Sequence, residues 1–167
     1  MKALHPGNIT QTPQPKSVGT SASCFAMTME ASMPSEIKAI SLLVDQIMRL
    51  IERSSCIVGD EAAVELALRE ALNIAVTHGN AMESHQFVEV RCRCERGQGV
   101  WLEVRDQGEG FDPNAVPDPL APDRLEAVHG RGIHLMRSAM DEVSFKAGRT
   151  VVRMRKRAGD HGQKKCR

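Results

Sequence analysis

Apolar residues recur at three- and four-residue spacing in two stretches of the chain, and this pattern predicts two amphipathic helices. The first covers about residues 33–51 and the second about residues 60–78. Asp60 is well placed to cap the start of the second helix, and Gly79 is a natural C-cap that ends it. A shorter helix is expected over residues 133–140, directly after paired glycines.

Apolar and polar residues alternate in five other stretches, which predicts strands that are buried on one face. The expected strands cover residues 24–30, 87–94, 100–105, 142–146 and 150–154. The second and third of them flank a turn that contains glycine, as in a hairpin. A chain of 167 residues with these elements suits one α/β domain plus tails, large enough to bury a core.

The two ends of the chain differ in composition from its middle. Residues 1–22 are rich in Pro, Ser, Thr, Gln and Gly and hold too few apolar groups to offset the entropy of ordering, so we expect a disordered tail. Residues 158–167 form a basic tail, which leaves residues 23–157 as the folded domain. The N-terminus lacks the apolar core of a signal peptide, and no apolar run approaches the ~20 residues of a membrane span. We therefore expect a cytoplasmic protein without membrane contact.

The charge balance argues against a nucleic-acid-binding protein. The chain has 22 basic and 21 acidic residues, a formal net charge of +1, and only 3% aromatic residues. A basic run near the C-terminus (Arg153, Arg155, Lys156 and Arg157) fits either a nucleic-acid contact or a solvated strand end. The neutral balance and the scarce aromatics favour the strand end, and we expect no direct contact with nucleic acid.

The five cysteines stand at irregular spacing, which is typical of neither a disulfide framework nor a metal site. Cys92 and Cys94 lie two positions apart on an expected strand and therefore point to the same face. We expect these thiols to be small buried or half-buried groups.

Candidate chemistry begins where the expected strand over residues 100–105 ends. Asp106 follows it on a loop that also holds Gly108 and Gly110. Glycines let backbone approach a ligand where a Cβ would clash. The same residues are common in plain turns, so the loop alone does not decide between a ligand site and a turn.

Two further features stand before and after this loop. Glu70 lies on the second helix and shares a face with Asn73 and His78, although a solvated helix carboxylate is the alternative for Glu70. Gly130 and Gly132 open the third helix, where free N–H groups and the helix dipole create an anion site.

These three features, in this order, resemble the ATP-binding fold shared by gyrase, the Hsp90 chaperone, histidine kinases and the MutL repair protein. The short length, without a phospho-acceptor helical domain, is similar to the anti-sigma-factor serine/threonine kinases. The resemblance covers about residues 25–157. It implies an α+β two-layer sandwich of the Bergerat type, in which a mixed, mostly antiparallel sheet is covered by helices.

The resemblance implies an adenine site on the first loop. Asp106 matches the family aspartate that accepts a hydrogen bond from the adenine amino group, a charge-assisted bond that selects adenine. Gly108 and Gly110 match glycines that let the base and ribose settle on backbone. Thr150 matches a threonine that lies near adenine in the family.

The resemblance also implies where the phosphates of ATP bind. Gly130 and Gly132 match the second glycine box of the family, and Arg131 between them could add a positive charge. The connector over residues 112–129, which contains four prolines, corresponds to the ATP lid of the family.

The catalytic helix departs from the family pattern at one position. Glu70 matches the glutamate that acts as general base, but the Mg²⁺-binding asparagine expected four residues later is replaced by Ile74. Asn73, one place earlier, is the nearest candidate ligand for Mg²⁺. One residue is about 100° of helix rotation, so Asn73 falls on the other flank of the face of Glu70. Isoleucine cannot ligate Mg²⁺, which requires oxygen ligands.

The resemblance implies protein partners and leaves two functions open. An active kinase would bind a sigma factor and phosphorylate a Ser or Thr of a STAS-type anti-anti-sigma protein. The alternative is a nucleotide-binding, sequestering module in which Ile74 has weakened or abolished catalysis. Family members are commonly dimers, which leaves a homodimer open for this chain.

Overall fold

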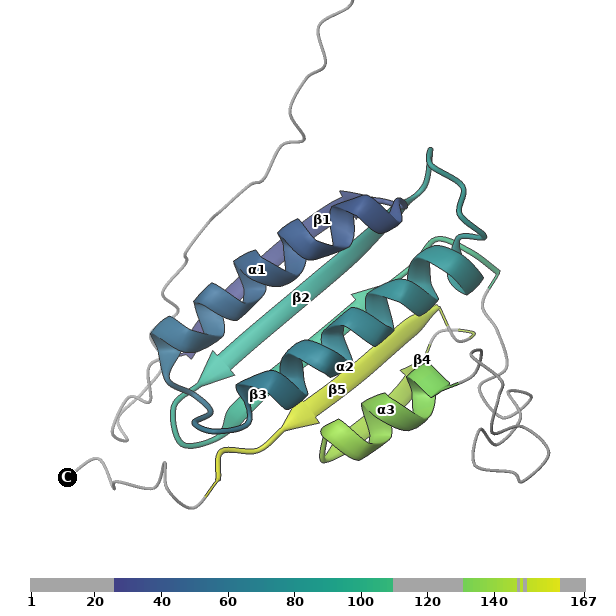
Figure 1. Ribbon diagram of the computed structural model, residues 1–167. Helices are drawn as coiled ribbons and strands as arrows, with labels where there is room; N and C mark the ends of the chain where they lie inside the picture. The colour runs from purple at the N-terminus through teal and green to yellow at the C-terminus, as the bar shows by residue number, and fades with distance from the viewer. Residues whose placement is uncertain (1–25, 110–130, 147, 149, 160–167) are drawn as a thin grey trace, which may run out of the picture.

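The computed structural model describes residues 26–109, 131–146, 148 and 150–159, and shows a sheet with helices on one face (Figure 1). The sheet has five strands in the order β1-β2-β3-β5-β4, and each pairing is antiparallel. The expected α+β two-layer sandwich is therefore confirmed. The strands are β1 (Ala26–Pro34), β2 (Phe87–Glu95), β3 (Gly99–Arg105), β4 (Glu142–Lys146) and β5 (Val151–Lys156). The helices are α1 (Ile37–Ser54), α2 (Glu61–Ile74), the π-helical turn η1 (Ala75–Gly79) and α3 (Arg131–Ala139).

The boundary between the first strand and the first helix lies later in the chain than expected. The strand expected to end at residue 30 continues to Pro34, because β1 pairs with β2 as far as the Pro34–Phe87 pair. The helix expected from residue 33 consequently begins at Ile37. Pairing with a distant strand outweighs the local helical pattern at these positions.

The second helix covers nearly the expected residues, but the structures at its two ends differ from the expected caps. Asp60 precedes α2, yet its side chain makes no capping hydrogen bond. The Glu61 carboxylate instead accepts a bond of 2.8 Å from the Gly59 amide. At the other end the α-helical bonds stop at Ile74 and one π-helical turn follows. Such turns are rare and occur frequently at functional sites.

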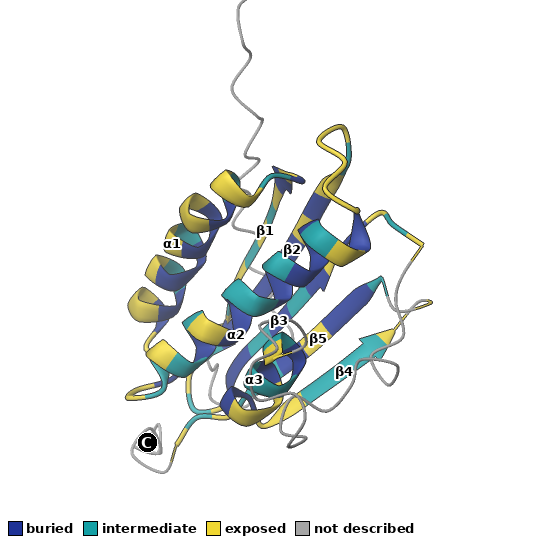
Figure 2. Cartoon of the chain, turned by 45° about the vertical axis from the view of Figure 1, so that its right-hand side comes forward, coloured by how far each residue is buried: buried dark blue, intermediate teal, exposed yellow. Residues whose placement is uncertain are grey.

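The core lies between the helices and one face of the sheet (Figure 2). Helix α1 packs on β1 and β2, α2 lies over β3, and α3 packs against α2 and β4. The largest fully buried side chains come from both layers: Val44, Ile47, Ile51, Val64, Leu68, Leu72, Val76, Val88, Val90, Val100, Leu102 and Met136. Their burial explains the helical and alternating apolar patterns of the sequence. No helix in the described part of the chain is long and apolar enough to cross a bilayer.

Three cysteines lie in this core, in agreement with the expectation of small buried thiols. Cys92 and Cys94 point to the same face, with 3.8 Å between their Sγ atoms, and Cys56 is also buried. A hydrogen bond with Cys94, together with burial, raises the pKa of the Cys56 thiol well above its usual range, which keeps it protonated. Cys24 and Cys166 lie outside the described residues.

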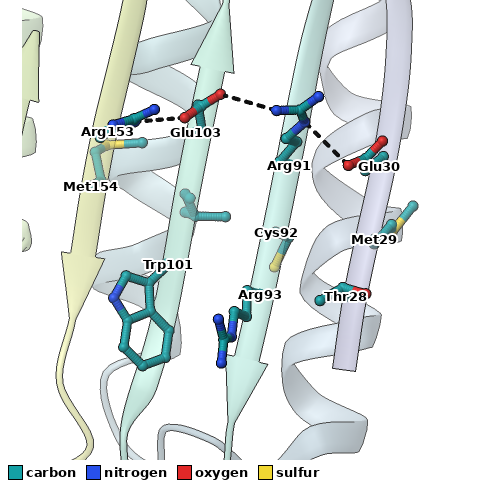
Figure 3. A pocket seen from close by; sticks show the side chains of 11 residues that line it. Thr28, Met29, Glu30, Arg91, Cys92, Arg93, Trp101, Glu103, Arg153 and Met154 are labelled. Atoms are coloured by element: carbon teal, nitrogen blue, oxygen red, sulfur yellow. Dashed lines mark hydrogen bonds and ion pairs between the residues drawn. The ribbon is translucent and has the colours of Figure 1, made fainter. Parts of the chain in front are cut away.

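The opposite face of the sheet carries a cross-strand row of alternating charges (Figure 3). Arg91 Nε lies 3.2 Å from Glu30 and Arg91 Nη1 lies 3.7 Å from Glu103, while Arg153 Nε donates to Glu103 at 2.6 Å. These four residues are directly opposed in the register of β1, β2, β3 and β5. The face is therefore held together laterally by its own ion pairs.

The basic run near the C-terminus reaches this face through Arg153. Its four members pair as follows: Arg153 with Glu103 at 2.6 Å, Arg155 with Glu142 at 3.6 Å, Lys156 with Asp60 at 3.7 Å and Arg157 with Glu142 at 2.6 Å. The Arg155 guanidinium also stacks 4.9 Å from the centre of the Trp101 ring. These pairings match the expected strand end, and the absence of a nucleic-acid contact stays a prediction.

Candidate functional site

Asp106 is a buried carboxylate at the end of β3, where it is held by two backbone groups. The residue is 7% exposed, and its backbone amide donates to the Thr150 carbonyl at 3.0 Å. The Gly108 amide donates to Asp106 Oδ1, also at 3.0 Å. Burial raises the pKa of Asp106 above its ordinary value, although the amides of Gly108 and Asp106 itself act in the opposite direction. The structure thus places the Thr150 carbonyl and the Gly108 amide beside Asp106, and the nucleotide-binding role of these residues stays a prediction.

Two glycines allow the end of the helix to press against this loop. A Cβ built on Gly79 would lie 2.5 Å from Asp106 Oδ2 and 2.8 Å from Asp106 Cβ. A Cβ built on Gly108 would overlap the carbonyl of Gly79. Neither residue could carry a side chain without moving the other segment.

This contact corrects the expected role of Gly79 as a helix C-cap. Gly79 lies inside η1 and is absent from the positions with positive φ, whereas Ala81 and Met82 have φ of 47° and 61°. The glycine is required by the close approach of Asp106, and not by left-handed backbone at the helix end.

A second cluster forms where α2 meets the first turn of α3. A Cβ on Gly132 would lie 2.8 Å from Glu70 Oε2 and 3.2 Å from Ile74 Cδ1. Glu70 and Ile74 are one helical turn apart, so both side chains face Gly132. The structure therefore brings Glu70 and the start of α3 together, while the roles expected of Glu70 and Gly132 stay predictions. Arg131, the first residue of α3, is exposed.

Asn73 leaves α2 from a different direction. It is half-buried, and its backbone carbonyl accepts a 2.7 Å bond from the Thr77 hydroxyl. Because one residue turns the helix by about 100°, Asn73 and Ile74 lie on opposite flanks of Glu70, and the flank of Ile74 meets Gly132. Gly110, Gly130 and the connector over residues 112–129 lie outside the described residues.

Sequence reasoning missed one polar group of the site, the side chain of Asn80. This residue is 1% exposed, and its Oδ1 accepts from the Gln107 amide at 2.8 Å. Its Nδ2 donates to the Phe87 carbonyl at 3.1 Å. An asparagine after a glycine usually indicates a turn, so the only available signal was that Asn80 follows the candidate helix directly.

The five-stranded antiparallel sheet with helices on one face is that of a Bergerat-type ATPase domain. The family model of the histidine kinase-like ATPase domain matches residues 33–156, and the chain belongs to this family. ATP is the nucleotide that such domains bind. Comparison with curated proteins yields no significant match.

The residues present fit an adenine nucleotide better than they fit the metal. The Asp106 carboxylate is a fixed acceptor at the contact between Gly79 and Gly108. By contrast, the position that faces Gly132 beside Glu70 holds an aliphatic side chain, which offers no oxygen ligand to Mg²⁺. In the described ranges, no three His, Cys, Asp or Glu side chains are grouped so that they could hold a metal ion.

Proposed function

We propose that the protein is an ATP-binding regulator of the anti-sigma type, with a sigma factor and a STAS-type anti-anti-sigma protein as its partners. The observation that carries ATP binding is the buried Asp106 carboxylate, pinned by the Gly108 amide against Gly79. The partners rest on the resemblance to anti-sigma-factor kinases described above. Membership of the histidine kinase-like ATPase family supports the nucleotide.

Asp106 would read the base of the nucleotide. A carboxylate accepts a charge-assisted hydrogen bond from the exocyclic amino group of adenine. Guanine carries a carbonyl oxygen at the equivalent position, and the burial of Asp106 makes an unpaired, repelled charge costly. The site should therefore bind ATP in preference to GTP.

Glu70 would act on the hydroxyl of a partner protein. Its Oε2 lies at the first turn of α3, where the family places the phosphates, so the carboxylate is close to the reaction centre. Glu70 would take the proton of a Ser or Thr hydroxyl while the new O–P bond forms and ADP leaves. The remaining nucleotide contacts in this region would come from Gly130, Arg131 and Gly132.

A second function is favoured by the environment of Ile74. Its Cδ1 approaches Gly132 beside Glu70, so the metal ligand of the family is missing from the face that meets α3. Without that ligand the protein would bind nucleotide and hold its partner but transfer no phosphoryl group. Gain or loss of nucleotide would then control sequestration.

Calorimetric titration with ATP, ADP and GTP, each with and without Mg²⁺, tests the proposal. ATP binding with at least about tenfold preference over GTP, lost in Asp106→Ala, is the expected result. Failure to bind ATP in either condition would refute the proposal.

Incubation with γ-labelled ATP, Mg²⁺ and a STAS-domain protein then separates the two functions. Transfer that is abolished by Glu70→Gln supports the kinase. Binding that is indifferent to Mg²⁺, without transfer, supports the sequestering module.

A further inference from the structure

We propose that Asn80 is a positioning residue for the nucleotide site, because its side-chain amide holds the loop that carries the adenine-reading carboxylate. The inference rests on the proposed function and adds to it a residue outside the matched motifs. We call the two hydrogen bonds of this side chain, to Gln107 and to Phe87, the Asn80 bridge.

The Asn80 bridge stands where the sheet ladder between β2 and β3 stops. The last strand pair at this end is Glu89 with Arg105, and continuing that register places Phe87 opposite Gln107. The Phe87 carbonyl and the Gln107 amide are bonded to the two ends of the Asn80 side chain, at 3.1 and 2.8 Å. The side-chain amide thus occupies the place of an extra peptide group between the two strands.

Gln107 adds a parallel connection of the same kind. Its side-chain Oε1 accepts from the Phe87 amide at 2.8 Å, so two carboxamides join the strand ends. The Asn80 side chain bridges the two strand ends by two hydrogen bonds, and the Gln107 side chain joins them by one. The chain leaves the ladder directly after Asp106 and packs Gly108 on Gly79.

Asn80 is itself fixed by the π-helical turn. Its backbone amide donates to the Ala75 carbonyl at 2.8 Å, five residues back, and the next two residues adopt left-handed backbone. The turn therefore delivers a fully buried amide to the Gln107 amide, one residue after Asp106. Without these two bonds the loop after Asp106 would lose its side-chain attachment to Phe87 and to the end of the π-helical turn.

A purely structural role for Asn80 and a positioning role predict different results. Lost stability alone would leave the ATP affinity of the folded protein and its preference for ATP over GTP unchanged. A displaced Asp106 loop would lower both. Ser54→Ala is the matched control, because Ser54 is also buried and its hydroxyl bonds the Ile51 carbonyl and the Cys56 amide at the far end of α1.

The experiment compares wild type, Asn80→Ala and Ser54→Ala in the full chain. NMR measures the hydrogen exchange of the Gln107 and Gly108 amides without nucleotide, and calorimetry measures the affinities for ATP and GTP. For Asn80→Ala we expect faster exchange at both amides, ATP binding weakened at least about tenfold, and a smaller ATP-to-GTP ratio. Ser54→Ala should leave all three unchanged.

A second variant keeps the test decisive if Asn80→Ala does not fold. Gln107→Ala removes only the bond that the exposed Gln107 side chain accepts from the Phe87 amide. It should weaken ATP binding about two- to fivefold, which is a change in binding free energy below about 1.4 kcal/mol. Exchange and affinity equal to those of Ser54→Ala, in whichever variant folds, would overturn the proposal. If wild type binds no nucleotide, the proposed function fails, and the exchange rates alone decide whether Asn80 holds the loop.

Discussion

The contact between Gly79 and Asp106 offers the sharpest test of the site geometry. Replacing Gly79 by Ala adds a methyl group 2.5 Å from Asp106 Oδ2 and 2.8 Å from Asp106 Cβ. Non-bonded carbon atoms prefer about 3.5–4.0 Å, so the carboxylate must retreat by roughly 1 Å. Two bonds of 3.0 Å oppose this movement, from the Asp106 amide to Thr150 and from the Gly108 amide to Oδ1.

The size of the effect follows from these constraints. Overpacking a core costs about 1–3 kcal/mol, and losing a hydrogen bond to a charged group costs about 1.5–3 kcal/mol. We therefore expect Gly79→Ala to lower the free energy of unfolding by about 3–5 kcal/mol, a large share of the roughly 5–15 kcal/mol typical of a domain. In the folded fraction, ATP should bind about 10- to 100-fold more weakly, because the adenine acceptor is displaced.

Urea unfolding and ATP titration measure both effects. Gly159→Ala is the matched control, since a Cβ at Gly159 would meet no atom within 4 Å. The reasoning is refuted if Gly79→Ala unfolds within about 1 kcal/mol of the control and binds ATP equally well.

Three further predictions concern the metal, the pH dependence and the outer face of the sheet. Ile74→Asn places an oxygen ligand beside Glu70, so calorimetry should show ATP binding that tightens with Mg²⁺, and an unchanged response would contradict the inferred role of position 74. Because burial raises the pKa of Asp106 above 3.8, the folded state binds the proton more tightly than the unfolded state, and urea midpoints should fall as pH rises from 3.8 through the folded pKa. Asp106→Asn should remove this part of the pH dependence of the urea midpoint. An identical pH profile in the variant would show that Asp106 is not its source. Glu103→Ala breaks the ion pairs of Glu103 with Arg91 and Arg153 in the cross-strand row of charges. It should lower the free energy of unfolding by about 0.5–1 kcal/mol, and by less in 1 M salt, while the ATP affinity stays unchanged. A loss of stability that does not depend on salt would contradict an electrostatic origin.

The sequence determined much of the fold because local periodicity and burial coincide. The apolar stripe of α2 and the alternation in β2, β3 and β4 predicted these elements within a few residues. Motif order, through the family resemblance, predicts that Asp106 and Glu70 belong to one nucleotide site. Where local preference and distant pairing disagreed, at residues 31–36, the strand pairing of β1 prevailed.

The tertiary structure decided which atoms meet. The approach of Gly79 to Asp106 and the bridge from Asn80 to Gln107 join residues that are 27 positions apart in the sequence. Both contacts begin at the π-helical turn that ends α2. No local pattern encodes such contacts, since they depend on how the end of α2 sits over the ends of β2 and β3. The family resemblance predicted that Ile74 stands where an asparagine is expected, and the packing of α2 against α3 shows that the Ile74 side chain faces Gly132 together with Glu70.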